Sequence, residues 1–200
     1  GPIMGNDGTT TLISGAAMRA AVSATKGLIA GNAERAERDR QVPVENIEAL
    51  RDTGMFKALQ PARYGGTPMG AEEYTPALVD LAGACASTTW VAGLLTQHSH
   101  MLALMSEELQ DEVWGPDPDA LASSSVAAIN GCEEVPGGGV RLNGAWGWSS
   151  GCDHCTWAIL GFRRADPALG GMVIPFFAVV PRTDYTIHDD WHVAALCGTG

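Results

Sequence analysis

The feature that most constrains the fold of this chain is a change of hydrophobic periodicity near residue 116. Before this point apolar side chains recur at helical spacing; after it they alternate or form short apolar runs, as strands do. The pattern predicts an α+β protein in which a helical domain, residues 14–116, precedes a β-domain, residues 117–200. Residues 1–13 are expected to be a tag remnant and a disordered N-terminus.

Helix-capping signals mark the expected elements of the first half. Pro43 is acceptable at the first position of a helix, and Gly54 is a typical residue at a helix end. Ser87 and Ser106 are typical N-cap residues, because their hydroxyl oxygens accept backbone N–H groups of the first turn. The expected helices span residues 14–41, 43–54, 71–84, 88–105 and 107–114.

The second half is expected to be mainly strand from residue 120 to residue 195. Asn143-Gly144 is a pair that supplies the positive φ angles of a two-residue turn, so the residues around it are predicted to form a β-hairpin. The expected strands span residues 121–128, 140–142, 145–148, 156–162, 173–180 and 185–193.

Composition excludes several classes of function. The formal net charge is −11, and no basic patch is visible, which argues against a nucleic-acid partner. No apolar run approaches the ~20 residues that a membrane span needs. The N-terminus lacks the basic segment and apolar core of a secretory signal, so a cytoplasmic protein without a membrane partner is expected.

The cysteines do not form the pattern of a disulfide framework or a zinc site. Their number is odd and their spacing uneven, which fits a reducing compartment. Cys152 and Cys155 form a CxxC sequence, but zinc would require a second pair of ligands at similar spacing. We therefore expect ordinary thiols and no bound metal. The cysteines are Cys85, Cys132, Cys152, Cys155 and Cys197.

His98 is a candidate for chemistry because it shares a helix face with apolar side chains. At 100° per residue, Trp90, Leu94, Met101 and Met105 fall with it within about a third of the circumference. Two interpretations remain open: a core histidine satisfied by backbone or water, or a histidine that faces a pocket. In the second case its near-neutral pKa suits proton exchange with a substrate hydroxyl.

Two serine-rich segments are further candidates. In the expected strand at Ser123-Ser124-Ser125, side chains alternate, so Ser124 faces away from its neighbours. The block Trp148-Ser149-Ser150-Gly151 places hydroxyls beside a glycine and an aromatic ring, which suits a flat heteroaromatic ligand lying close to backbone. A polar strand end and an ordinary turn are the alternatives. Rossmann, P-loop and serine-hydrolase motifs are absent from the sequence.

Longer stretches of sequence carry a resemblance to a known family. They are Leu81–Trp90, His98–His100, Glu108–Trp114, Asp117–Ser125 and Leu142–His154. In these stretches the chain closely resembles the oxygenase components of the p-hydroxyphenylacetate 3-hydroxylase family of two-component flavin-dependent monooxygenases. The most specific signal is the sequence Trp-Ser-Ser-Gly-Cys-Asp-His, which follows His-Ser-His and Ser-Ser-Ser.

The resemblance implies the acyl-CoA dehydrogenase fold: an N-terminal helical domain, a central β-domain and a C-terminal four-helix bundle. The helices and strands expected from periodicity agree with the first two parts. The bundle is absent from this sequence, so the chain looks like the N-terminal half of a longer protein. The family assembles through the bundle, which implies a homotetramer.

The resemblance also implies a chemistry. Reduced FMN, or FAD as the alternative, would come from a separate flavin reductase and react with O₂ to give a C4a-hydroperoxyflavin. That species would hydroxylate a small aromatic substrate, a phenol, ortho to its hydroxyl. His98 and Ser124 would hold the hydroxyl, and Ser150 would bond the flavin N5. The residues implied to contact the flavin are Trp90, Ser124, Trp148, Ser149 and Ser150.

Three other interpretations stay open. An acyl-CoA dehydrogenase would share the fold but would not need a histidine on the pocket face. A hydroxylase of a carrier-tethered aromatic or of an amine nitrogen would keep the flavin residues and alter the substrate pocket. A non-catalytic assembly partner is the third class.

Overall fold

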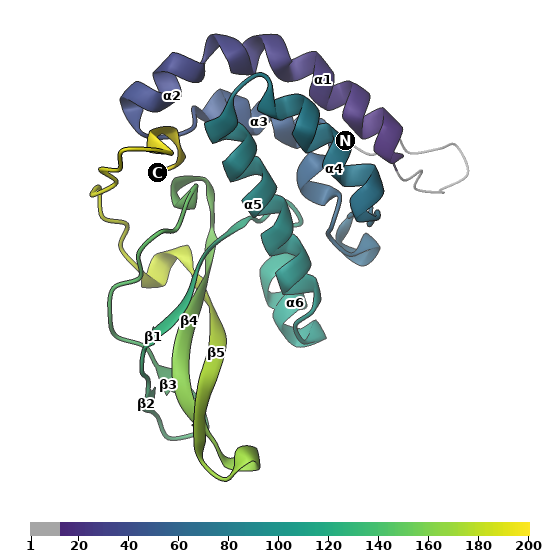
Figure 1. Ribbon diagram of the computed structural model, residues 1–200. Helices are drawn as coiled ribbons and strands as arrows, with labels where there is room; N and C mark the ends of the chain where they lie inside the picture. Colours follow the sequence, from purple (N-terminus) through teal and green to yellow (C-terminus); the bar gives the residue numbers. More distant parts are fainter. Residues whose placement is uncertain (1–12) are drawn as a thin grey trace.

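The computed structural model describes residues 13–200, which form an arched helical part with a long twisted sheet beside it (Figure 1). The expected tag remnant lies outside the described residues, except for residue 13. The helices precede the strands in the chain, as periodicity predicts. The α-helices are α1 (Gly15–Gly31), α2 (Ala33–Asp39), α3 (Val44–Asp52), α4 (Ala71–Ala82), α5 (Ala86–Ala103) and α6 (Glu107–Trp114). The strands are β1 (Ala122–Asn130), β2 (Glu133–Glu134), β3 (Val140–Arg141), β4 (Trp157–Asp166) and β5 (Met172–Pro181).

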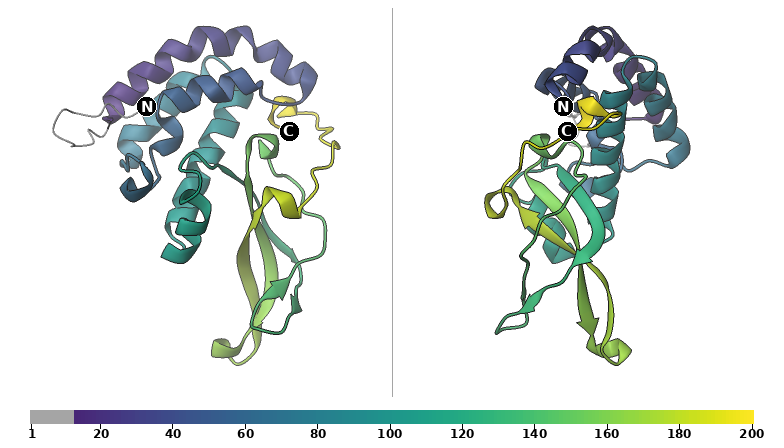
Figure 2. Two further views of the ribbon diagram at one scale, coloured as in Figure 1. Left: turned by 180° about the vertical axis from the view of Figure 1, so that it is seen from behind. Right: turned by 60° about the vertical axis from the view of Figure 1, so that its left-hand side comes forward.

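The first expected helix is in fact two helices. α1 ends at Gly31 and α2 begins at Ala33, so the prediction of one helix over residues 14–41 is wrong. Glycine and asparagine are weak helix formers. The side chain of Asn32 donates from Nδ2 to Oδ1 of Asn46 at 2.8 Å, which ties the junction to α3. The break turns α2 so that its end reaches the C-terminal part of the chain (Figure 2).

The N-terminal cap of α5 also differs from the prediction. Cys85 is the cap, and its Sγ accepts the N–H of Thr88 at 3.5 Å. Ser87 lies inside the helix, where its hydroxyl donates to Glu37 on α2. The hydroxyl of Ser87 is therefore used in a contact between helices. The cap predicted for α6 is confirmed, because Oγ of Ser106 accepts a backbone N–H of the first turn.

The three-stranded sheet has the order β1-β4-β5. β1 is parallel to β4, and β4 is antiparallel to β5. The register between β1 and β4 shifts between Ser125 and Asn130, where β1 bulges. Gly161 on β4 permits this close approach, because a Cβ there would lie 2.3 Å from the backbone oxygen of Val126. Within residues 13–200 no α-helix intervenes between the strands, which confirms an α+β fold.

Strand is less extensive than expected over residues 120–195. The hairpin predicted at Asn143-Gly144 is wrong, because residues 142–149 form neither strand nor hairpin turn. The short antiparallel pair β2–β3 instead encloses Gly137 and Gly138, which both have positive φ and supply the turn. Trp146 donates from Nε1 to the backbone oxygen of Gly161 at 2.8 Å and fixes the irregular segment against β4.

The strand predicted at residues 185–193 is also wrong. This segment is irregular and runs back to the helical part, where Arg40 donates to the backbone oxygen of Trp191 at 2.9 Å. The indole of Trp191 donates to the backbone oxygen of Leu196 at 3.1 Å. A side chain thus binds the carbonyl of Trp191, which a strand would pair in a ladder.

The helical and sheet parts share their hydrophobic core. Leu121 and Cys155 pack with the buried side chains of α1, α3, α4 and α5. A second cluster joins Trp114 and Leu102 to Ala122 and Ile159 of the sheet. The packing holds β1 against α5, the two elements that carry the candidate site. Among the described residues, no helix is both long enough and apolar enough to cross a membrane.

Candidate functional site

His98 lies on α5 with its ring buried against β1; only 3% of its surface is exposed. Its Nδ1 lies 2.7 Å from the backbone oxygen of Ala122, and its Nε2 lies 2.8 Å from Oγ of Ser124. A carbonyl oxygen can only accept, so Nδ1 carries the proton and Nε2 is the acceptor in the neutral ring. The hydroxyl of Ser124 therefore donates to Nε2.

Burial lowers the pKa of His98 from its ordinary value, and the hydrogen bond to Ala122 partly opposes this change. The ring is thus held neutral, in one tautomer, with its basic nitrogen directed at a hydroxyl. Such an arrangement can accept a proton from a polar ligand or hold the oxygen of that ligand.

The serine triplet alternates as predicted. Ser124 is half-buried and faces His98, whereas Ser123 and Ser125 are buried. Oγ of Ser125 donates to the backbone oxygen of Gly147 at 2.6 Å, which joins β1 to the segment that leads to Ser150. Oγ of Ser123 is buried without a hydrogen-bond partner. β1 thus presents the hydroxyl of Ser124 to His98 and the hydroxyl of Ser125 to the neighbouring loop.

Trp90 and Ser150 form the second contact of the site. The indole of Trp90 donates from Nε1 to Oγ of Ser150 at 3.3 Å, and Ser150 is buried. Trp90 and His98 are eight residues apart on α5, about 12 Å along the helix axis. α5 therefore carries both the Trp90–Ser150 pair and the His98–Ser124 pair.

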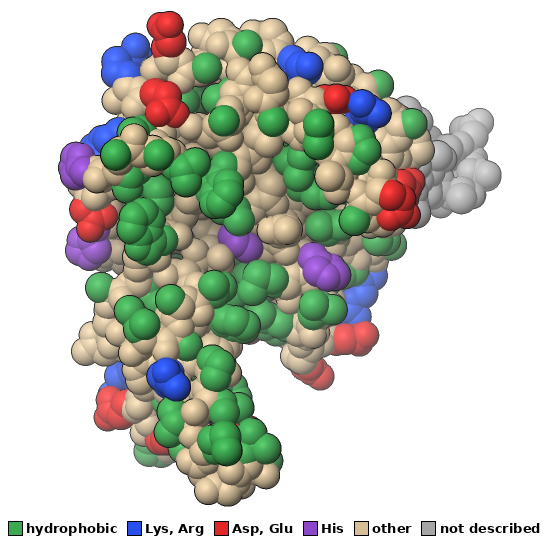
Figure 3. Space-filling model, viewed as in Figure 1, with side chains coloured by type: hydrophobic (Ala, Val, Ile, Leu, Met, Phe, Trp, Pro, Cys, Tyr) green, Lys and Arg blue, Asp and Glu red, His purple; other side chains and the backbone are tan. Residues whose placement is uncertain are grey.

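The face of α5 that carries Trp90 is only partly buried. Trp90 is 47% exposed and Leu94 is half-buried, whereas Val91 and Leu95 are fully buried. A neighbouring face of α5, with Val91 and Leu95, thus packs into the core, and the Trp90 face is left partly open. Hydrophobic side chains gather where the helical part meets the sheet, and the surface is hollowed there (Figure 3).

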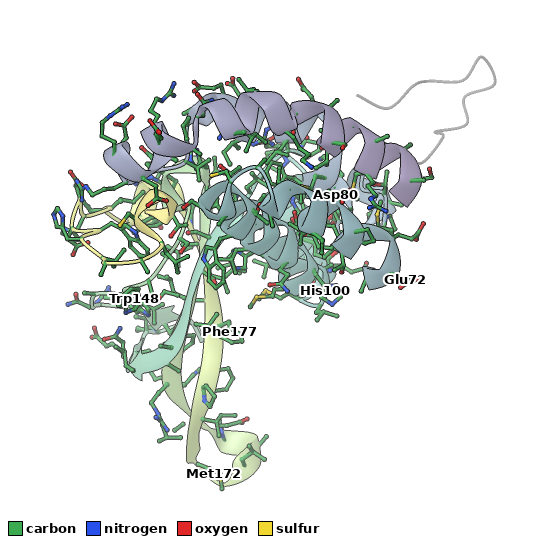
Figure 4. The ribbon with its side chains drawn as sticks, turned by 45° about the horizontal axis from the view of Figure 1, so that its top comes forward. Glu72, Asp80, His100, Trp148, Met172 and Phe177 are labelled. Atoms are coloured by element: carbon green, nitrogen blue, oxygen red, sulfur yellow. The ribbon has the colours of Figure 1, made fainter. Side chains whose placement is uncertain are left out.

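Trp148 is an exposed aromatic side chain two residues before Ser150. It is 76% exposed and lies at the margin of the molecule, far from Glu72 and Asp80 (Figure 4). Its φ is +63°, a left-handed conformation that is rare for a bulky residue. The ring meets Trp191 edge-on, with centroids 5.5 Å apart. Ser149 is half-buried between Trp148 and Ser150.

Gly151 fixes the backbone beside Ser150, which gives a stability prediction. Its φ is +71°, and an added Cβ would lie 2.6 Å from Cγ1 of Val91. We expect Gly151→Ala to lower the free energy of unfolding by about 1–3 kcal/mol, measured by chemical denaturation. Gly147→Ala is the control, because its Cβ would meet no atom within 4 Å. Equal stability of the two variants would contradict the prediction.

The CxxC residues lie just after this loop and are not suited to thiolate chemistry. Burial raises the pKa of Cys152 to about 11, with a further contribution from Asp153. Burial also raises the pKa of Cys155, whose Sγ donates to the backbone oxygen of Gly151 at 3.4 Å. No group of three or more histidine, cysteine or acidic residues suited to a metal occurs in the described part of the chain.

Sequence reasoning missed several residues that support the site. The 185–200 segment, which includes Trp191, contacts the loop at Ser150 and is itself held by Arg40 and Glu37. The backbone oxygen of Ala122 fixes the tautomer of His98. No local pattern signals these contacts. A surface hollow of about 410 Å³ between α1 and α4 contains none of the predicted site residues; the Arg19–Asp80 ion pair lies there.

Comparison with known proteins identifies similar chains. Residues 16–117 match the model of the acyl-CoA dehydrogenase N-terminal domain. The oxygenase component of p-hydroxyphenylacetate 3-hydroxylase from Acinetobacter baumannii is 48% identical over 94% of this chain and 44% of its own length. The oxygenase component of the FADH(2)-dependent resorcinol hydroxylase from Rhizobium sp. (strain MTP-10005) is 39% identical over 89% of this chain and 43% of its own length.

A solved structure confirms the fold. The HsaA monooxygenase from M. tuberculosis superimposes with a TM-score of 0.87 at 36% identity, over 94% of this chain and 50% of that chain. The chain thus spans less than half of the length of the two curated relatives and about half of this structure. The resemblance read from the sequence is confirmed by these matches.

Proposed function

The chain belongs to the acyl-CoA dehydrogenase family, whose N-terminal domain it carries, and we propose that it forms part of a reduced-flavin-dependent monooxygenase that hydroxylates a phenol ortho to its hydroxyl. The observation that carries the proposal is the buried, neutral His98 with Nε2 directed at the hydroxyl of Ser124. Its relatives are named as oxygenase components, which supports a separate flavin reductase as partner. A homotetramer is a further part of the proposal.

The residues around Ser150 fit a flavin. Trp90, whose indole donates to Ser150, and Trp148, two residues before Ser150, both expose aromatic surface, and the left-handed backbone at Trp148 and Gly151 sets the shape of the loop that carries this hydroxyl. Ser149, Ser150 and Trp148 would hold the flavin ring, with the hydroxyl of Ser150 at N5. Bound there, reduced flavin supplies with O₂ the electrophilic oxygen of the reaction. FMN rather than FAD is our prediction.

His98 and Ser124 would bind the phenol hydroxyl. Nε2 of His98 can take the phenol proton directly or through Ser124, because its other nitrogen is already committed to Ala122. A phenolate is a better carbon nucleophile at the ortho position than the phenol. The buried ring and the backbone hydrogen bond hold this base in place without reorganisation.

The state of His98 gives a pH prediction. Its pKa lies below the ordinary 6.5, so most of the rings stay neutral as the pH falls from about 8 to 6.5, and protonation becomes dominant only at lower pH. We expect the rate of oxygen transfer to stay level over that range and to fall below it, measured by rapid mixing at saturating phenol. A fall centred at or above pH 7 would contradict the prediction.

A panel of substrates tests the proposed function. The protein that carries this chain would be mixed with reduced FMN or FAD, O₂ and one of three compounds: a phenol, an acyl-CoA or a primary amine. O₂ reoxidises the flavin during the experiment, and the oxidised flavin can then accept the hydride of an acyl-CoA. We expect an ortho-hydroxylated product from the phenol and only H₂O₂ from the other two. Hydroxylation of the amine, or dehydrogenation of the acyl-CoA, would replace the proposal with one of its alternatives.

A further inference from the structure

The 185–200 segment lies between α2 and the Trp148–Gly151 loop, and its two ends are held by different groups. It crosses from the sheet to the helical part, beside α2 and α5 (Figures 1 and 2). Within it, the backbone oxygen of Leu196 accepts from the indole of Trp191 at 3.1 Å and from Oγ1 of Thr199 at 2.9 Å. These bonds give an irregular segment a defined shape.

Two charged side chains, Glu37 on α2 and Arg40 at its C-terminal cap, hold the segment on the helical side. Arg40 donates to the backbone oxygen of Trp191 at 2.9 Å and forms an ion pair with Asp189 at 2.9 Å. Glu37 accepts the backbone N–H of Gly198 at 3.3 Å and the hydroxyl of Ser87. Asp189 is 87% exposed, so the ion pair is weak, and the bond from Arg40 to the Trp191 carbonyl is the stronger restraint.

On its other side the segment contacts the candidate flavin loop. The N–H of Gly151 donates to the backbone oxygen of Thr199 at 3.0 Å, and Thr199 is fully buried. The ring of Trp191 meets Trp148 at an interplanar angle of 77°. A left-handed tryptophan persists only where its surroundings hold it, and Trp191 is the aromatic partner that does so.

We propose that Arg40 and Glu37 are positioning residues, which act through the 185–200 segment to hold Trp148 and the backbone of Ser150-Gly151 in the geometry that binds reduced flavin. This inference rests on the proposed function for its ligand. Neither residue touches the ligand itself. Arg40 fixes the carbonyl of Trp191, and Trp191 fixes Trp148; Glu37 fixes Gly198, and the adjoining Thr199 fixes Gly151.

Circular dichroism tests, without any flavin, whether Arg40 holds Trp191 against Trp148. Indoles in contact couple their excited states and give paired bands of opposite sign. Arg40→Gln removes the guanidinium, and we expect it to lose most of that signal. Arg38→Gln should keep it, because Arg38 lies in the last turn of α2, two residues before Arg40, and among the described residues forms its ion pair with its neighbour Asp39. Trp191→Phe removes one of the two indoles without altering α2, so a signal that disappears in this variant is assigned to the Trp148–Trp191 contact.

The affinity for reduced flavin tests whether the 185–200 segment positions the Trp148–Gly151 loop. We expect Arg40→Gln, Glu37→Ala and Trp191→Phe each to weaken binding by about tenfold, the effect of one lost charge-assisted or buried hydrogen bond. Arg38→Gln should bind as the parent does. Thermal unfolding of every variant shows that the loss is not one of folding.

Three outcomes would overturn the inference. A coupled signal that survives in Arg40→Gln shows that Arg40 does not hold Trp191. A signal that is lost while flavin binding stays at the parental value shows that the segment does not position the site, and leaves the proposed function intact. If the parent itself has no affinity for reduced flavin, the proposed function fails as well, and the dichroism alone still reports the contact.

Discussion

His98→Ala should slow oxygen transfer to the phenol by about two to four powers of ten, the usual contribution of a positioned acid–base group. The reaction of reduced flavin with O₂ should stay almost unchanged, because His98 contacts Ser124 and Ala122 and not the Trp90–Ser150 pair. Rapid mixing of the reduced-flavin complex with oxygen and a phenol resolves the two steps. Product analysis of the same samples gives the fraction of turnovers that end in hydroxylation.

His100→Ala is the matched control for this variant. His100 is an exposed histidine two residues further along α5, and Figure 4 shows it on the helical part, well apart from Trp148. Its removal should leave both steps at the parental rate. If His98→Ala transfers oxygen at the parental rate, then His98 is a core histidine and the proposed role in substrate binding is wrong.

Ser150→Ala should have the converse effect. It removes the oxygen that accepts the indole N–H of Trp90 and that we propose bonds the flavin N5. We expect H₂O₂ to be released about ten to a hundred times faster than from the parent, because the proposed bond from Ser150 to the flavin N5 is lost and one such bond is worth about 1–3 kcal/mol. Phenol binding should change little, because Ser124 and His98 keep their contact.

The measurement for Ser150→Ala is the ratio of H₂O₂ to hydroxylated product in a single turnover. Ser23→Ala serves as control, since Ser23 is exposed on α1 and far from Ser150 in the chain. An unchanged ratio in Ser150→Ala would mean that this hydroxyl does not protect the reaction from uncoupling.

Periodicity predicted much of the fold because local forces decide it. The break between helix and strand, the cap at Ser106 and the alternation at Ser124 follow from side-chain spacing and capping chemistry. The hairpin at Asn143-Gly144 failed because Gly137-Gly138 forms the turn instead. At residues 185–193 the expected strand is absent, and Arg40, some 150 residues earlier, binds the carbonyl of Trp191, a contact that local pattern cannot reveal.

Local side-chain spacing also predicted part of the candidate site. His98 and Ser124 were found from spacing and from resemblance, since each lies on a regular element with a definite facing. Whether the α5 face is covered by core or faces a pocket could not be decided, because spacing gives the direction of a face but not what covers it; in the structure Trp90 is 47% exposed. Glu37 and Trp191 could not be found, because their contacts depend on an irregular segment.

The most direct test of the central claim is a single turnover with isotopically labelled oxygen. The protein that carries this chain would be loaded with reduced flavin and a phenol and mixed with ¹⁸O₂, and the products would be analysed by mass spectrometry. The account predicts one labelled oxygen in the aromatic product, ortho to the original hydroxyl, and loss of that label to H₂O₂ in His98→Ala. An unlabelled phenol, with all of the label in H₂O₂ from the parent protein, would contradict it.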